Sequence, residues 1–138
     1  MAEHGKAAMK IRIIVADDHK IVRDGLRTLL ENQPDMEVIA EAEDGQTAVQ
    51  LVREMDPDVV IMDVAMPVMN GIEATRQIAA RHLRAKIIAL SMYADRRFKQ
   101  EMIRAGASDY LEKDCAFDEL AQVIRNAMGS KSPYNLLA

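Results

Sequence analysis

Short apolar runs alternate with longer amphipathic stretches along most of this chain. Three runs are apolar at almost every position: Ile11–Ala16, Val59–Met62 and Ile87–Leu90. Strands of this kind are typical of a sheet that is covered on both faces. A shorter strand is predicted around Tyr110 and Leu111.

Another segment shows a strict alternation instead of a continuous apolar run. Its small or apolar residues are Met36, Val38, Ala40 and Ala42. These residues alternate with charged or larger ones, which predicts a strand nearer the edge of the sheet.

The stretches between the runs carry apolar residues at helical spacing. The stripes are Val22/Leu26/Leu29/Leu30, Ala48/Leu51/Val52/Met55, Ile72/Thr75/Ile78/Ala79, Phe98/Met102/Ala105 and Leu120/Val123/Ile124/Ala127. Each stripe predicts an amphipathic helix. Five strand–helix units therefore fill residues 11–128, and such alternation predicts an α/β fold with a parallel sheet and helices on both faces.

Composition narrows the class of protein. The chain is 49% hydrophobic and 29% charged, and its 18 basic and 22 acidic residues give a net charge of −4. These values exclude a disordered chain and a globally basic nucleic-acid binder. The single cysteine, Cys115, excludes an internal disulfide framework and favours a reducing, cytoplasmic setting. No apolar run approaches the roughly 20 residues of a membrane helix, so we expect no membrane association.

We expect one domain over residues 10–129. Residues 1–9 have no apolar middle, which argues against a secretory signal and indicates a loose tail. Residues 130–138 contain serine and proline and resemble the start of a linker.

Polar residues follow four of the predicted strands. They are Asp17 and Asp18 after the first strand, Asp63 after the third, Ser91 after the fourth and Lys113 after the fifth. In an open parallel sheet, ligands bind outside the carboxyl ends of the strands, so we expect these side chains to lie together. Each residue alone also fits a solvated turn, a helix cap or a surface lysine. Their common position at one sheet edge favours a functional site.

Three neighbouring carboxylates repel one another unless a cation lies among them. Oxygen ligands of this kind favour Mg²⁺. Lys113 can pair with a carboxylate or a phosphate, and the Ser91 hydroxyl can donate to a phosphate oxygen. His19 follows the acidic pair; a metal-binding or acid–base role is open, and a residue that starts a helix beside the site is the favoured interpretation.

Across residues 10–128 the sequence resembles the receiver domain of bacterial two-component response regulators. The resemblance is carried by IRIIVADDHKIVRDGL, VVIMDVAMPVMNGIEA, KIIALSMYADRRF and AGASDYLEKD. The phrase ADDHKIVRDGL and the aspartate after the late lysine are most similar to the NarL/FixJ group, whose receivers usually precede a LuxR-type helix-turn-helix. The resemblance implies the flavodoxin-like (CheY-like) doubly wound fold, with five parallel strands in the order 2-1-3-4-5.

The resemblance also implies a phosphorylation site. Asp63 corresponds to the phosphoacceptor, and Asp17, Asp18 and Asp63 correspond to the carboxylates that hold Mg²⁺. The backbone carbonyl of Ala65 corresponds to a further metal ligand, which leaves its side chain free to vary.

A switch is implied by the same resemblance. Lys113 corresponds to the residue that pairs with the phosphoryl group, Ser91 to the switch hydroxyl and Tyr110 to the switch aromatic. We expect Ser91 to move toward the phosphoryl group and to carry residues 92–95 and the helix after them with it. The chain departs from the family pattern twice, with serine in place of the commoner threonine and with no proline after Lys113.

The function implied is signalling controlled by phosphorylation. A sensor histidine kinase is the expected partner, and the domain catalyses its own phosphorylation and dephosphorylation without being a turnover enzyme. The resemblance allows a homodimer on phosphorylation. Contact with DNA, for transcription regulation, is expected only through a C-terminal helix-turn-helix outside this chain.

Two other classes of protein stay open. An aspartate-nucleophile phosphohydrolase uses similar chemistry, but its nucleophile lies in an Asp-x-Asp pattern after the first strand, which Asp17-Asp18-His19 does not match. A receiver fold used only for protein contacts usually lacks an aspartate or the lysine, and this chain has both.

Overall fold

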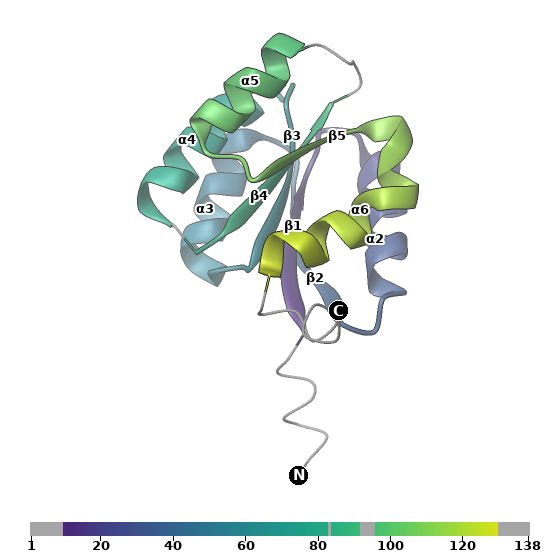
Figure 1. The fold of residues 1–138 in the computed structure, drawn as a ribbon. Coiled ribbons are helices and arrows are strands. Elements are labelled where there is room, and N and C mark those ends of the chain that lie inside the picture. The colour runs from purple at the N-terminus through teal and green to yellow at the C-terminus, as the bar shows by residue number, and fades with distance from the viewer. Residues whose placement is uncertain (1–9, 83, 92–95, 130–138) are drawn as a thin grey trace.

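The computed structural model describes residues 10–82, 84–91 and 96–129, except for the side chains of residues 96, 97, 115 and 116. The predicted tail, the predicted linker and the Cys115 side chain therefore lie outside the described part. Strands and helices alternate in the described residues (Figure 1). The elements are β1 (Ile11–Ala16), α2 (Lys20–Glu31), β2 (Met36–Ala42), α3 (Gly45–Met55), β3 (Val59–Asp63), α4 (Gly71–Arg81), β4 (Lys86–Ser91), α5 (Arg96–Ala105), β5 (Asp109–Glu112) and α6 (Lys113–Met128).

The sheet has five parallel strands in the order β2-β1-β3-β4-β5, which confirms the predicted fold. Helices α2 and α6 cover one face, and α3, α4 and α5 cover the other (Figure 1). Because every strand runs in the same direction, all the carboxyl ends lie at one edge of the sheet. This edge carries the candidate site.

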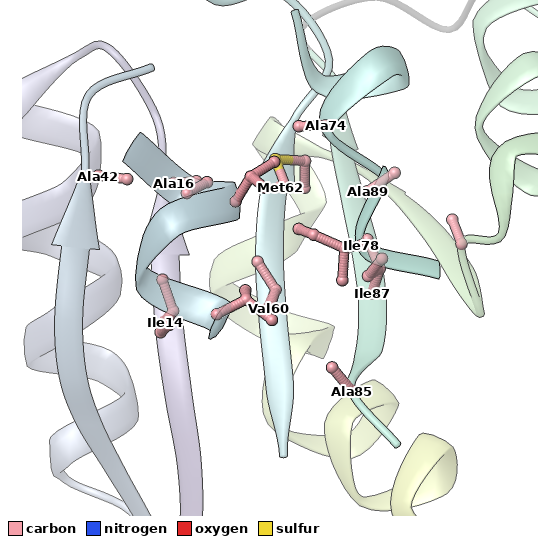
Figure 2. Close-up of a cluster of buried hydrophobic side chains, with 14 of the residues drawn as sticks. Ile14, Ala16, Ala42, Val60, Met62, Ala74, Ile78, Ala85, Ile87 and Ala89 are labelled. Carbon is pink, nitrogen blue, oxygen red and sulfur yellow. The ribbon is translucent and has the colours of Figure 1, made fainter. Parts of the chain in front are cut away.

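The larger core cluster lies between the sheet and helices α3, α4 and α5. Figure 2 shows Ile14, Val60 and Ile87, from three neighbouring strands, facing Ile78 of α4. All five residues of β3 are buried. The continuous apolar runs of the sequence therefore form the interior strands, and a helix layer covers each of their faces.

Strand β2 departs from the predicted alternation. Ile13 pairs with Val38 and Ile14 pairs with Ala40, so Ile39 is an extra residue in β2 at a bulge. Val38 belongs to the core under α2 and α6, whereas Ala40 packs against the other core cluster. The bulge therefore reverses the two faces halfway along the strand. The predicted edge position is confirmed.

Two helices on the second face begin at side-chain caps. Asp44 Oδ1 accepts the N–H of Thr47 at 2.8 Å, and Asn70 Oδ1 accepts the N–H of Glu73 at 2.9 Å. Such caps satisfy N–H groups that have no partner within the helix, and each stabilises by about 1 kcal/mol. Among the helices that the structure describes, none has the length and apolarity that crossing a membrane needs.

Candidate functional site at the carboxyl edge of the sheet

The ends of three strands bring two aspartates and a lysine together. Asp17 follows β1, Asp63 ends β3, and Lys113 begins α6 directly after β5. All three residues are buried. Asp18, next to Asp17, is more open to solvent, with a side chain that is 33% exposed. The structure thus brings together four of the residues that the sequence placed at this edge.

The ammonium group of Lys113 lies between the two buried carboxylates. Its Nζ is 2.6 Å from Asp17 Oδ2 and 3.4 Å from Asp63 Oδ2. Neither Oδ2 atom accepts a hydrogen bond of good geometry within the described residues, so the contact rests on charge and proximity. One ammonium therefore faces two carboxylates and leaves both incompletely satisfied.

Burial raises the pKa of Asp63 from 3.8 to about 6, and repulsion by Asp17 acts in the same direction. The positive charge of Lys113 opposes this rise, as does the N–H of Ala65, 3.4 Å from Asp63 Oδ1. At pH 7 a carboxyl group with this pKa is roughly 90% ionised. Asp63 is therefore available as an anion, and its environment favours any added positive charge.

The acidic group has the composition of a cation site. Asp17, Asp18, His19 and Asp63 each offer one ligand atom, and these atoms all lie within 4.8 Å of one another. Mg²⁺ prefers carboxylate and carbonyl oxygens together with water. The incompletely satisfied oxygens of Asp17 and Asp63 and the more open carboxylate of Asp18 fit that preference.

His19 is the N-cap residue of helix α2, which agrees with the favoured interpretation of a residue that starts a helix beside the site. Its N–H donates to Asp17 Oδ1 at 2.8 Å, and its ring Nδ1 is 3.1 Å from both Asp17 Oδ1 and Asp18 Oδ1. The ring is 61% exposed. His19 therefore lies at the solvent side of the acidic pair and orients it through the backbone and the ring.

Helix α4 packs directly against the backbone of Asp63. The N–H of Gly71 donates to the carbonyl of Val64 at 2.8 Å, and a Cβ on Gly71 would lie 1.9 Å from the Asp63 carbonyl oxygen. Only glycine permits this approach. Gly71 is thus the first residue of α4 and holds the end of β3 in place.

The loop between β3 and α4 contains a strained residue that the sequence analysis missed. Val68 has a φ of 66°, a conformation that β-branched residues rarely adopt. It is the centre of a tight turn in which the Met69 N–H donates to the Pro67 carbonyl at 2.7 Å. The Met69 carbonyl in turn accepts the N–H of Gly45 at 2.9 Å, which ties this loop to α3.

The two expected switch residues lie on neighbouring strands. Ser91 is the buried last residue of β4 and pairs with Glu112, while Tyr110 pairs with Ala89 two positions earlier. Tyr110 is partly buried and packs against the core cluster under α3, α4 and α5. Residues 92–95, which were expected to move with Ser91, lie outside the described residues.

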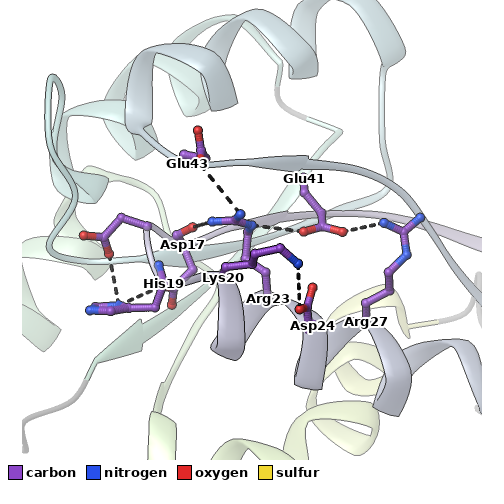
Figure 3. A network of polar contacts seen from close by, with 9 residues as sticks. Asp17, His19, Lys20, Arg23, Asp24, Arg27, Glu41 and Glu43 are labelled. Atoms are coloured by element: carbon purple, nitrogen blue, oxygen red, sulfur yellow. Dashed lines mark hydrogen bonds and ion pairs between the residues drawn. The ribbon is translucent and has the colours of Figure 1, made fainter.

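A buried arginine beside the acidic pair was also missed. Arg23 of α2 donates from Nη1 to the carbonyl oxygen of Asp17 at 2.7 Å and from Nε to Glu41 Oε1 at 3.0 Å (Figure 3). The sequence contains a signal for it: Arg23 lies three and seven residues before Leu26 and Leu30, on the buried face of the helix.

Comparisons with known proteins agree with this arrangement. Residues 13–125 match the model of the response regulator receiver domain family. Transcriptional regulatory protein LiaR of Bacillus subtilis is 47% identical over 117 residues, covering 85% of this chain and 56% of LiaR. Transcriptional regulatory protein DegU of Brevibacillus brevis is 40% identical over 116 residues, covering 84% of this chain and 49% of DegU. The chain thus spans about half the length of these relatives.

Solved structures show the same fold. A two-component response regulator of the LuxR family from Aurantimonas has a TM-score of 0.83 and 39% identity, covering 93% of this chain and 94% of the other. The response regulator domain of Thermotoga maritima CheB has a TM-score of 0.80 and 34% identity, covering 86% and 96%. From the family match, the identities and the shared fold together, this chain belongs to the response regulator receiver domain family.

Proposed function

We propose that this domain accepts a phosphoryl group on Asp63 from a sensor histidine kinase, with Mg²⁺, and that it thereby acts as a signalling switch. The observation that carries the proposal is the position of Asp63, buried at the carboxyl edge of the sheet beside the Lys113 ammonium, which also contacts the Asp17 carboxylate. Family membership supports the same chemistry.

In the proposed reaction, an ionised oxygen of Asp63 attacks the phosphorus of a phosphohistidine. The new oxygen–phosphorus bond forms as the phosphorus–nitrogen bond breaks, and the histidine nitrogen keeps the electron pair. Because both the carboxylate and the phosphoryl group are anionic, catalysis consists mainly of charge neutralisation and in-line positioning. Lys113 contributes one positive charge at the place where the phosphoryl oxygens gather.

Asp17, Asp18, Asp63 and the backbone carbonyl of Ala65 would hold Mg²⁺ in this reaction. When bound, the ion supplies positive charge that stabilises the transferring phosphoryl oxygens. Asp17 is fixed beside Lys113, whereas Asp18 is open to solvent and gives the site a side from which ion and phosphodonor can enter.

The proposed output begins at Ser91. Its hydroxyl would donate to a phosphoryl oxygen, and Tyr110 would respond on the neighbouring strand. The pairing of Ser91 with Glu112, and of Ala89 with Tyr110, supports direct transmission between β4 and β5. A phosphoryl group shifts this equilibrium only through contacts that differ between the two states.

The proposed setting is a longer, cytoplasmic transcription regulator. LiaR and DegU are named transcriptional regulatory proteins and are about twice as long as the matched region. We expect DNA contact through a LuxR-type helix-turn-helix that follows the receiver domain, and homodimer formation on phosphorylation.

Acetyl phosphate with Mg²⁺ tests the proposal directly. Intact-mass measurement should find one phosphoryl adduct on the parent chain and none on Asp63→Asn. Asp58→Asn is the matched control, because Asp58 lies before β3, at the opposite edge of the sheet, and should leave the adduct intact. An undiminished adduct on Asp63→Asn would contradict the proposal. Sustained release of phosphate would instead indicate a phosphohydrolase, and absence of any adduct on the parent would indicate a domain used only for protein contacts.

A further inference from the structure

The peptide that joins Asp17 to Asp18 lies beyond the regular part of the sheet. The last paired residues of β1 and β3 are Ala16 and Met62. The N–H of Asp17 still donates to the carbonyl of Ala42 on β2, at 3.0 Å, but Asp17 itself comes after the last pair between β1 and β3. A buried carbonyl requires a donor, and Arg23 Nη1 supplies one at 2.7 Å.

The guanidinium group of Arg23 is itself held in place. Its side chain is only 9% exposed, and its Nε donates to Glu41 Oε1 at 3.0 Å. Glu41 also pairs with Arg27, one helical turn further along α2 (Figure 3). Glu43 lies 3.8 Å from Arg23 Nη2. The positive charge of Arg23 is therefore balanced by Glu41 and Glu43. Its contact with the candidate site is the hydrogen bond to the Asp17 carbonyl.

We infer that Arg23 is a positioning residue for the cation site: by binding the Asp17 carbonyl, it fixes the plane of the Asp17–Asp18 peptide and thus the direction in which the Asp18 carboxylate leaves the backbone. This inference rests on the proposed function of the acidic pair. Arg23 does not contact the ion or the phosphoryl group. It acts only through Asp17 and Asp18.

Arginine suits this role better than lysine does. The planar guanidinium directs one N–H to the Asp17 carbonyl and another to Glu41 at the same time. The ammonium of lysine is a point charge on a flexible stem and does not reproduce the fork. Arg23→Lys thus keeps the charge, changes the geometry and is the informative variant.

The experiment compares Arg23→Lys with Arg27→Lys. Arg27 lies on the same helix and shares the partner Glu41, and none of its described contacts involves Asp17. In the metal-free proteins, the amide resonance of Asp18 should move in Arg23→Lys and stay in place in Arg27→Lys. Titration with Mg²⁺ should give a Kd about tenfold weaker for Arg23→Lys, as for other residues that orient metal ligands. At saturating Mg²⁺, both variants should reach the parent's yield of acetyl phosphate adduct.

A second variant guards against misfolding of the first. Glu41→Gln leaves Arg23 in place but loosens its guanidinium, so its Mg²⁺ affinity should fall between those of Arg27→Lys and Arg23→Lys. An Arg23→Lys protein that is folded and binds Mg²⁺ within twofold of the parent would overturn the positioning role. A parent chain that binds no Mg²⁺ would overturn the proposed function instead, and the metal-free amide resonance of Asp18 would then decide the role of Arg23 alone.

Discussion

The sheet has a buried aspartate at each edge, and the two differ in how completely their carboxylates are paired. At the amino edge, Asp35 accepts two hydrogen bonds from Arg125 of α6, at 3.0 and 2.8 Å. The same guanidinium also donates to Gln33 at 2.7 Å. At the carboxyl edge, Asp63 is also buried, but its Oδ1 accepts the Ala65 N–H at a long 3.4 Å. Its Oδ2 lies 3.4 Å from Lys113 Nζ and accepts no hydrogen bond of good geometry within the described residues.

This difference separates a structural ion pair from a reactive one. The bidentate pair at Asp35 joins α6 to the segment before β2 and leaves nothing for a ligand to satisfy. The carboxylates at the other edge are not fully balanced by positive charge, and a bound cation can supply what is missing. Strong pairing stabilises one edge, and incomplete pairing prepares the other for chemistry.

The backbone shows the same contrast. Two residues other than glycine have positive φ among the described residues: Asp56, with 49°, and Val68, with 66°. Asp56 ends α3 near the amino edge, and aspartate tolerates this conformation well. Val68 lies in the loop after Asp63 and does not. Conformational strain is therefore concentrated beside the site.

The largest expected effect is at the amino edge. Arg125→Met would leave Asp35 buried without its charged partner, and loss of one member of a buried pair costs about 4 kcal/mol. Urea unfolding at pH 7 measures the loss in free energy of unfolding. Arg76→Met, which breaks an exposed pair with Glu73, is the control and should change the free energy of unfolding far less than Arg125→Met does. A cost for Arg125→Met as small as that of the control would contradict the contrast between the edges.

Asp63→Asn should raise the free energy of unfolding, whereas Arg125→Met should lower it. The pKa of Asp63 is about 6 in the folded state and 3.8 in the ordinary case, so between these pH values the folded state binds more protons than the unfolded state. Stability therefore falls as the pH rises through this window, by about 3 kcal/mol in total. Asparagine does not titrate, and Lys113 keeps its contact with Asp17.

Without Mg²⁺, Asp63→Asn should accordingly be about 3 kcal/mol more stable than the parent at pH 8. The difference should shrink steadily as the pH falls from 6 toward 4. Urea unfolding across this pH range tests both statements. A variant less stable than the parent at pH 8 would show that the Asp63 carboxylate is well satisfied.

Mg²⁺ should reduce the difference between the two edges, because it supplies positive charge to the carboxylates of the carboxyl edge. At a hundredfold excess over its Kd, the ion should stabilise the parent by about 2.7 kcal/mol. Asp18→Ala should lose most of this gain, whereas Ser91→Ala, which removes no carboxylate, should keep it. Thermal unfolding with Mg²⁺ and with a chelator provides the measurement. Equal gains in parent and Asp18→Ala would place the ion elsewhere.

The smallest effect concerns the strained turn. Val68→Asn should stabilise the fold by about 1 kcal/mol, because asparagine accepts positive φ more readily. Val68 is 78% exposed, so little packing is lost. Asp56→Val makes the reverse change near the amino edge and should destabilise by about 1 kcal/mol. A neutral Val68→Asn, measured by urea unfolding, would mean that the turn holds no strain.

Local pattern predicted the elements well and their arrangement less well. The run Ile11–Ala16 is β1 itself, and Val59–Met62 lacks only Asp63 of β3. Both runs are rich in β-branched residues, which favour strands. The strand order came from family resemblance, since periodicity does not say which strands are neighbours. The bulge at Ile39 was not predicted because an inserted residue leaves no mark in a simple alternation.

The site was predicted where its residues end strands and missed where they act from elsewhere. Asp17 and Lys113 directly follow strands and Asp63 ends one, and parallel topology alone brings the three together. The Asp35–Arg125 pair spans 90 positions and has no local signal. The turn at Val68 was not predicted because valine rarely adopts positive φ. Arg23 was predictable in principle, as an arginine on the buried face of α2.

Strand β1 lies between β2 and β3, so during synthesis one of its two neighbours is made only after a delay. Ile13 pairs with Val38 on one side and with Val59 on the other, and Val59 is 46 residues further along the chain. A ribosome adds roughly 5 to 20 residues per second, so β3 emerges about 2 to 9 s after β1. For those seconds the most apolar strand of the nascent chain has an open edge. The strand order that assembles the site thus also creates an interval in which the growing chain is exposed to aggregation and to capture by chaperones.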